Sequence, residues 1–444
     1  MNNSRVRSWL CCAAIVLAFV MAFPPGALAQ DEGGPEQVTL TVWLRDHPAR
    51  ASVDRDLIAR FMEANPHITV ALALIAPEQY DDRLRVALIN RQGPDLFMQW
   101  SGEVGNLLGG RFIAPLDPLA AGFAEEEGVY EAYAHGEALL SVVAFDGQLY
   151  GLPLRVDTLL CYANDDLWEA AGLDPEADFP ATWEAMREVA EQLTQRDGDN
   201  NILQRGFDFN WSAPLFMWLQ FEPMVRQLGG ALIDEANSVV ALATPAVAQV
   251  MAYWRDWAGA WALGGPRYKD SRSAFLTGEL ATECSFGVWG AQQIEAAGVN
   301  WSAHPAPRWE GAVEDNGLAL YADFLMVNAG APPPAQRAAW QLAGFLLGYP
   351  ERYFTEAGHL QPRADWVNDE RFQPDALMQL ALREMAVSFY PPRVPGFMAA
   401  AGRLAAGRTR VLQGEDIDQV LAALQADVEQ AVDDAARDLE RVAY

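Results

Sequence analysis

The amino-acid sequence predicts an α/β protein in which helices cover a mostly parallel sheet. Near the N-terminus, strand-like runs at 38–44, 68–75 and 95–98 alternate with segments 52–65 and 80–90, whose apolar residues recur at helical spacing. The order strand, helix, strand, helix, strand is typical of a parallel sheet covered by helices. The same alternation returns further along the chain with longer elements.

The first strand and helix show how each element is recognised. Residues 38–44 read VTLTVWL, which is rich in the β-branched and aromatic residues that favour strands. In 52–65, Leu57 and Phe61 belong to an apolar stripe on one helix face. Pro66 ends that helix, because proline lacks the backbone N–H that a helix interior needs.

The second half of the chain repeats these patterns. Residues 158–162, 280–287 and 318–327 have strand composition, and Thr182 is a suitable N-cap for a helix. The helices are expected at 181–195, 214–228, 244–262, 335–347 and 416–442.

The N-terminus has the features of a secretory signal. Arg5 and Arg7 precede an uncharged apolar run at 9–23, and an Ala-x-Ala sequence ends at Ala29. This order predicts that residues 1–29 are a signal peptide, cleaved after Ala29, and that the mature protein is periplasmic or extracellular. The alternative is an uncleaved N-terminal anchor.

The charge and the metal-ligand residues narrow the function classes. The formal net charge is −29, and a field of that sign repels phosphate backbones, which argues against nucleic-acid binding. None of the five histidines is spaced from a cysteine or another histidine as zinc ligands are, so we predict no metal and no cofactor. Cys161 and Cys284 are the two cysteines beyond the signal segment, and they either pair in an oxidising compartment or remain buried thiols.

Several short stretches occur together in an order that resembles family 1 of the extracellular solute-binding proteins, the maltose-binding-like receptors of ABC sugar importers. The resemblance runs from about residue 38 to the C-terminus. The stretches that carry it are 61–66, 93–96, 113–117, 150–153, 161–164, 171–173, 180–183, 228–230, 275–278 and 286–289.

The resemblance implies a two-lobed periplasmic-binding-protein-like α/β fold, with hinge-linked lobes and a ligand cleft between them. One lobe would hold residues 38–153 and 325–362, and the other 158–320 and 365–444. The hinge segments would be 154–157 and 321–324.

The function implied by the resemblance is that of a non-enzymatic receptor, expected to be a monomer. It would bind a saccharide or similar small polar solute, close by hinge bending, and deliver the ligand to the membrane permease subunits of an ABC importer. The alternative is a secreted glycoside-processing enzyme, which would need two carboxylates at a set separation.

Candidate ligand contacts in the first lobe follow two strands. Ligands of open α/β sheets bind at the carboxyl ends of strands, and a sugar needs aromatic plates together with polar partners. Trp43, Arg45 and Asp46 end the first strand, while Gln99 and Trp100 follow the third. Trp43 could instead point into the core.

Candidate contacts in the second lobe are aromatic residues in loops. Asn210 and Trp211 occur in a loop, and Trp289 closes the stretch Phe-Gly-Val-Trp. The resemblance gives Trp289 a stacking role, and it places Phe397 near another stacking position at which tryptophan is more usual. Each of these aromatic residues could instead pack in the core.

The hinge segments contribute four polar candidates, namely Arg155, Asp157, Tyr321 and Asp323. The charged side chains of Arg155, Asp157 and Asp323 would contact the ligand or pair with one another. The resemblance also implies that the segments holding Cys161 and Cys284 are strands of one sheet, which favours a disulfide between them.

Overall fold

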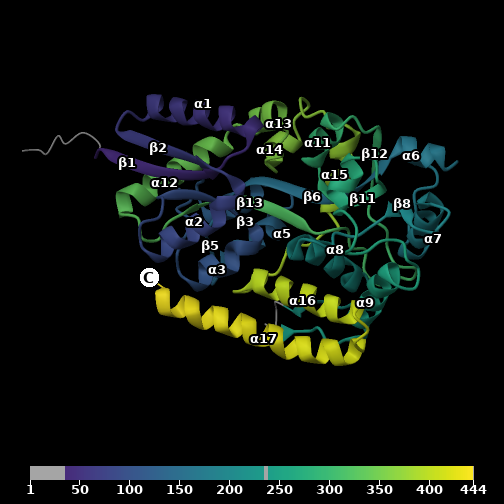
Figure 1. The fold of residues 1–444 in the computed structure, drawn as a ribbon. Coiled ribbons are helices and arrows are strands. Elements are labelled where there is room, and N and C mark those ends of the chain that lie inside the picture. Colours follow the sequence, from purple (N-terminus) through teal and green to yellow (C-terminus); the bar gives the residue numbers. More distant parts are fainter. Residues whose placement is uncertain (1–35, 235–238, 444) are drawn as a thin grey trace, which may run out of the picture. The chain divides into compact units, whose positions relative to one another are not determined.

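The computed structural model describes residues 36–234 and 239–443 (Figure 1). The predicted signal segment 1–29 lies outside the described residues. Within the described ranges, no helix combines the length and apolar character that crossing a membrane requires.

The main sheet is mixed (Figure 1). Strands β2, β1 and β3 run parallel, as do β11 and β8, whereas β13 pairs antiparallel with both β3 and β6. The strand order is β2 (Ile68–Ile75), β1 (Val38–Arg45), β3 (Leu96–Trp100), β13 (Leu320–Val327), β6 (Leu152–Asn164), β11 (Leu280–Gly287), β8 (Ile202–Phe207) and β7 (Gln195–Arg196), with β12 (Trp301–His304) also paired to β6. Short pairs are formed by β4 (Ala144–Phe145) with β5 (Gln148–Leu149) and by β9 (Ile233–Asp234) with β10 (Val239–Val240).

Helices of the first part of the chain follow its strands. They are α1 (Pro48–Ala64), α2 (Pro77–Ile89), the short helix η1 (Ser101–Glu103), α3 (Val104–Gly109), α4 (Glu126–Glu131), α5 (Gly136–Ser141), α6 (Asp165–Ala170) and α7 (Trp183–Leu193). The predicted cap Thr182 is confirmed, because its hydroxyl accepts a hydrogen bond from the Ala185 backbone N–H at 3.2 Å.

The remaining helices include several that the sequence patterns did not predict. They are α8 (Pro214–Gln227), α9 (Pro245–Ala258), α10 (Ser271–Leu276), α11 (Gly290–Ala296), α12 (Pro333–Leu347), α13 (Pro350–Ala357), α14 (Ala364–Val367), α15 (Ala376–Met385), α16 (Phe397–Leu412) and α17 (Ile417–Val442). Helix α16 packs against α17, and Gly407 of α16 allows the contact because a Cβ there would overlap Leu424.

The buried side chains form two large hydrophobic clusters. The first surrounds β1, β3 and β13 and includes Leu40, Phe97 and Phe324. The second is rich in aromatic residues and includes Trp183 and Trp254. Strand β6 contributes side chains to both clusters, because its alternate residues face opposite sides of the sheet.

Part of the C-terminal region belongs to the first cluster. The rings of Trp366 and Phe372 lie 6.2 Å and 5.1 Å from the ring of Phe354 in α13. The segment just beyond residue 365 is therefore anchored on the same side as α13.

Candidate functional site

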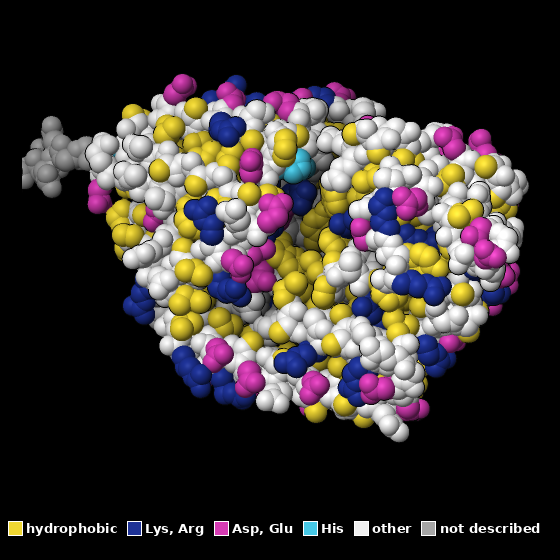
Figure 2. All heavy atoms as spheres, in the orientation of Figure 1, with side chains coloured by type: hydrophobic (Ala, Val, Ile, Leu, Met, Phe, Trp, Pro, Cys, Tyr) yellow, Lys and Arg dark blue, Asp and Glu magenta, His cyan; other side chains and the backbone are white. Residues whose placement is uncertain are grey.

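A cavity of about 1020 Å³ opens where the central strands β6 and β13 pass between the two clusters. Its volume is at the upper end of the ~300–1,000 Å³ typical of small-molecule sites. Figure 2 shows this face of the molecule hollowed at its centre, with hydrophobic side chains on the walls of the hollow. Seven of the predicted site residues line it, namely Arg45, Gln99, Trp100, Arg155, Trp289, Tyr321 and Asp323.

Asp323 connects the two arginines of the cavity. Its Oδ2 lies 2.9 Å from Arg155 Nη2, and its Oδ1 lies 3.4 Å from Arg45 Nη1. Burial alone would raise the pKa of Asp323, but the charges of Arg155 and Arg45 outweigh that effect and hold the pKa below its usual value. Asp323 is therefore ionised and shared between both guanidinium groups.

Arg45 makes two further contacts that orient the first wall. Its Nη2 donates to Gln99 Oε1 at 2.8 Å and to Asp81 Oδ1 at 2.6 Å. Gln99 Nε2 also donates to Asp81 Oδ1 at 3.0 Å. Because each arginine already has a carboxylate partner, this end of the cavity offers fixed hydrogen-bonding groups without an uncompensated positive charge.

Asp157 lies behind the cavity and does not line it. Its Oδ2 accepts from the Tyr321 hydroxyl at 3.0 Å, and its Oδ1 accepts from the backbone N–H groups of Thr158 and Val288 at 2.8 Å and 3.1 Å. Burial raises the pKa of Asp157. Asp157 therefore positions Tyr321 and the loop that follows β11. These hydrogen bonds within the protein satisfy its carboxyl group.

The two cleft tryptophans each rest on a glycine. Trp100 lies over Gly102 so closely that a Cβ at that glycine would overlap the indole ring. A Cβ at Gly287 would lie 2.8 Å from Trp289 Nε1. Each ring thus packs back on its own loop and lines the cavity.

Phe397 takes a supporting role rather than the predicted place in the cavity. It is fully buried, with its ring 6.2 Å from the Trp100 ring and 5.3 Å from the Trp218 ring, both edge-to-face. The cavity is instead lined by its neighbours Gly396 and Met398. Phe397 therefore holds Trp100 in place from behind.

A half-buried arginine supports the aromatic wall on the other side. The Arg272 guanidinium lies 3.6 Å from the Phe216 ring centre and 5.0 Å from the Trp289 ring centre, and both rings line the cavity. Its Nε donates to the Ser285 hydroxyl at 3.0 Å, and Ser285 is bonded in turn to the buried carboxylate of Glu283. Arg272 is thus fixed against both rings by attractive cation–π contacts.

Four predicted site residues lie away from the cavity. Trp43 packs against the first hydrophobic cluster under the Arg83 guanidinium, 5.6 Å from its ring centre, and Asp46 is exposed. Asn210 is buried, with its Oδ1 accepting from the Ala213 backbone N–H at 3.1 Å. Trp211 lies in the aromatic cluster, where its Nε1 donates to Asp208 Oδ1 at 2.5 Å. Asn210 and Trp211 use their polar atoms within the protein, and none of the four residues lines the cavity.

The sequence patterns missed the lining that comes from helix faces. An amphipathic helix shows the same apolar stripe whether that stripe faces a core or a cavity. The additional lining residues come from α2, α3, α8, α17 and nearby segments, and include Asp81, Leu84, Leu88, Glu103, Leu107, Phe112, Leu215, Phe216, Leu219, Met398, Asp438, Leu439 and Val442.

Cys161 of β6 and Cys284 of β11 form a disulfide. The two strands are antiparallel neighbours, and an irregularity in their register between Glu283 and Phe286 brings the cysteines opposite each other. Both cysteines are fully buried in the second cluster, away from the cavity lining.

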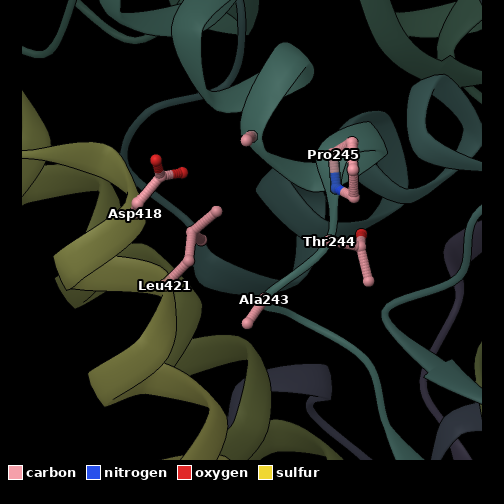
Figure 3. A pocket seen from close by; sticks show the side chains of 6 residues that line it. Ala243, Thr244, Pro245, Asp418 and Leu421 are labelled. Carbon is pink, nitrogen blue, oxygen red and sulfur yellow. The ribbon is translucent and has the colours of Figure 1, made fainter.

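A smaller pocket of about 540 Å³ lies between the start of α9 and α17 (Figure 3). Its lining contains Pro245, Leu421 and a single carboxylate, Asp418. Across the described ranges, no three histidine, cysteine or acidic side chains are grouped as metal ligands would be. The larger cavity, with its aromatic and charged lining, is therefore the candidate functional site.

The arrangement defines a class: a two-lobed α/β protein with a large cavity beside its central strands β6 and β13. Solved structures share the fold. The GacH receptor of Streptomyces glaucescens superposes with a TM-score of 0.73 at 17% identity, covering 90% of this chain and 99% of that one. A solute-binding protein of an ABC transporter from Thermotoga lettingae, solved with α-D-tagatose, gives a TM-score of 0.70 at 21% identity over 91% and 99% of the two chains.

The chain belongs to the bacterial extracellular solute-binding protein family, whose model matches residues 56–356. The maltotriose-binding protein of Pyrococcus abyssi is 17% identical over 397 residues, which are 88% of this chain and 81% of that relative. The predicted family resemblance and two-lobed α/β fold are confirmed. Members of this family bind solutes and are not enzymes, so the glycoside-processing alternative is wrong.

Proposed function

We propose that this protein binds a neutral saccharide in the 1020 Å³ cavity and delivers it to the permease of an ABC importer. The proposal rests on the lining of the cavity, which combines aromatic rings with hydrogen-bonding side chains that are held in place at one end. Trp100 and Trp289 offer flat faces for the C–H groups of a sugar ring, while Arg45, Gln99 and Asp323 offer partners for its hydroxyls.

The charge pairing favours a neutral ligand. An anionic ligand would have to compete with Asp323 for Arg45 and Arg155, and Asp81 would repel it. One relative, the sn-glycerol-3-phosphate-binding protein UgpB of Agrobacterium fabrum, is 26% identical over 42% of this chain and 43% of its own length. We therefore include sn-glycerol 3-phosphate as the second candidate ligand in a binding screen.

The lobe arrangement is part of the same proposal. Lobe one would hold residues 38–153 and 325–362, lobe two 158–320 and most of 365–444, with hinges at 154–157 and 321–324. The packing of Trp366 and Phe372 on Phe354 supports a lobe-two boundary somewhat beyond residue 365. The protein would act as a monomer that closes around its ligand by bending at these strands.

A thermal-shift screen followed by calorimetry tests the proposal. A ligand bound by the folded state alone raises the melting temperature, so neutral mono- and oligosaccharides should raise it and sn-glycerol 3-phosphate should not. The saccharide should be recovered unchanged after incubation. A shift with the phosphate alone would overturn the saccharide assignment, and release of cleaved sugar would overturn the receptor role.

A further inference from the structure

The cavity has two chemically different ends, and helix α2 runs along both. Its residues Asp81, Leu84, Arg85 and Leu88 lie on one helix face, at three- and four-residue spacing, and all line the cavity. Asp81 is bonded to Arg45 and Gln99 at the polar end. Seven residues further along, Leu88 is roughly 10 Å away along the helix axis.

The end near Leu88 is apolar and is formed by three helices. Leu107 comes from α3, while Leu439 and Val442 come from the last turns of α17. Helix α17 approaches α3 closely, because a Cβ at Gly109 would lie only 3.1 Å from Leu439 Cδ1. The charged side chains of Asp82, Arg85 and Asp438, which also line this part of the cavity, are exposed. We call this end of the cavity the apolar arm; it is continuous with the polar end, because both belong to the same cavity.

The small accessible surface of the arm decides what can occupy it. Leu84, Leu107 and Phe112 line it but are almost completely buried. A protein partner needs on the order of 800 Å² of accessible surface per side, which walls of this kind do not offer. A small apolar group attached to a molecule already held at the polar end needs far less surface.

From this geometry we propose that the ligand is an amphiphilic glycoside, whose sugar binds at the polar end and whose apolar substituent lies between α2, α3 and α17. The inference rests on the proposed saccharide function and names the ligand class more narrowly. A sugar alone would leave the partly exposed apolar side chains of the arm, among them Ile89, Leu439 and Val442, in contact with water, whereas an alkyl or aryl substituent would cover them.

Calorimetry with matched glycosides tests this proposal. The probes are methyl and hexyl glycosides of glucose, mannose and maltose, used below their micelle concentrations. A fully buried methylene contributes about 0.8 kcal/mol, or roughly four-fold in affinity. Partial burial of a hexyl chain is therefore expected to tighten binding at least about ten-fold over the methyl glycoside of the same sugar.

Two substitutions on α2 test whether the hexyl chain binds in the arm or is attracted to apolar surface in general. Ile89 lines the cavity and is 40% exposed, whereas Val86 is 56% exposed and is not part of the lining. In Ile89→Glu the ratio of hexyl-glycoside to methyl-glycoside affinity should fall to near one. Val86→Glu is the matched control and should retain the full advantage.

The outcomes are distinguishable from failure of the proposed function. Binding of methyl glycosides with no hexyl advantage would overturn this inference alone. A hexyl advantage that survives in Ile89→Glu, or that disappears equally in Val86→Glu, would also overturn it. If none of the glycosides binds, both the saccharide function and this inference are wrong.

Discussion

Trp289 and Trp211 are two tryptophans that sequence patterns treat alike and the structure separates. Each stands in a loop, and each has an arginine over its ring, Arg272 at 5.0 Å and Arg408 at 5.3 Å. Trp289 lines the cavity, whereas Trp211 is 8% exposed and belongs to the second hydrophobic cluster.

The difference lies in what each indole and its loop contact. The Trp211 indole N–H donates to the buried carboxylate of Asp208, and its ring meets the Trp254 ring edge-to-face at 5.1 Å. Trp289 instead lies against Gly287 and is half-buried in the wall of the cavity. A buried tryptophan whose N–H is bonded within the protein stabilises the fold, and one that lines the cavity is available for a ligand.

The largest effect that this comparison predicts is on stability. Trp211→Ala should lower the free energy of unfolding by about 3–5 kcal/mol, because it leaves a cavity in the aromatic cluster and removes a partner of Asp208. Urea unfolding measures this, with Trp289→Ala as the control expected to lose much less. Equal losses of stability in the two variants would contradict the distinction.

The disulfide provides a second test on the stability side. Replacing Cys161 and Cys284 together by alanine should lower the free energy of unfolding by about 2–4 kcal/mol, since the bond restricts the unfolded chain. Ligand affinity should not change, because neither cysteine lines the cavity. Thiol titration of the unreduced, denatured chain lacking residues 1–29 should find no free thiol, and finding two would refute the bond.

Trp289→Ala should have the opposite profile from Trp211→Ala. Removing a stacking plate from the cavity is expected to weaken saccharide binding by about 2 kcal/mol, or roughly 30-fold. Calorimetry measures the affinity and urea unfolding the stability of the same preparation. If the variant unfolds readily while its folded fraction binds normally, Trp289 is a packing residue.

The same comparison shows why sequence patterns succeed for some elements and fail for others. Residues 68–75 and 280–287 were predicted as strands and coincide with β2 and β11, because their composition and boundaries are local signals. Helix α16 was missed, since glycines such as Gly402 and Gly407 lower helix propensity. The structure places Gly407 where Leu424 of α17 leaves no room for a Cβ, which is a long-range reason.

Prediction of the site residues is limited in the same way, because it also depends on contacts between residues distant in sequence. Arg45, Gln99 and Trp100 lie at the carboxyl ends of β1 and β3 and line the cavity, as a rule about parallel sheets anticipates. Asn210 also occupies a loop, but its side chain is used to accept the Ala213 backbone N–H. Whether a loop residue faces the cavity depends on partners distant in sequence, and no local pattern contains that information.

The smallest predicted effect concerns the arginines that support the two tryptophans. Arg272→Met removes the charge beside Phe216 and Trp289 but keeps a side chain of similar length, and Glu283 retains its bonds to Ser271 and Ser285. Losing the cation–π support should loosen both rings and weaken saccharide binding by about 1 kcal/mol, or roughly five-fold.

The matched control is Arg408→Met. Burial lowers the pKa of Arg408 to about 10, and its Nη1 donates to the Trp211 carbonyl at 3.0 Å, within the stabilising cluster. This control should lower the free energy of unfolding and leave the saccharide dissociation constant unchanged. Arg272→Met should weaken saccharide binding and change the free energy of unfolding little, because the Arg272 guanidinium contacts two rings that line the cavity. If both variants change only stability, Arg272 is a packing residue like Arg408, and Phe216 and Trp289 hold their positions without it.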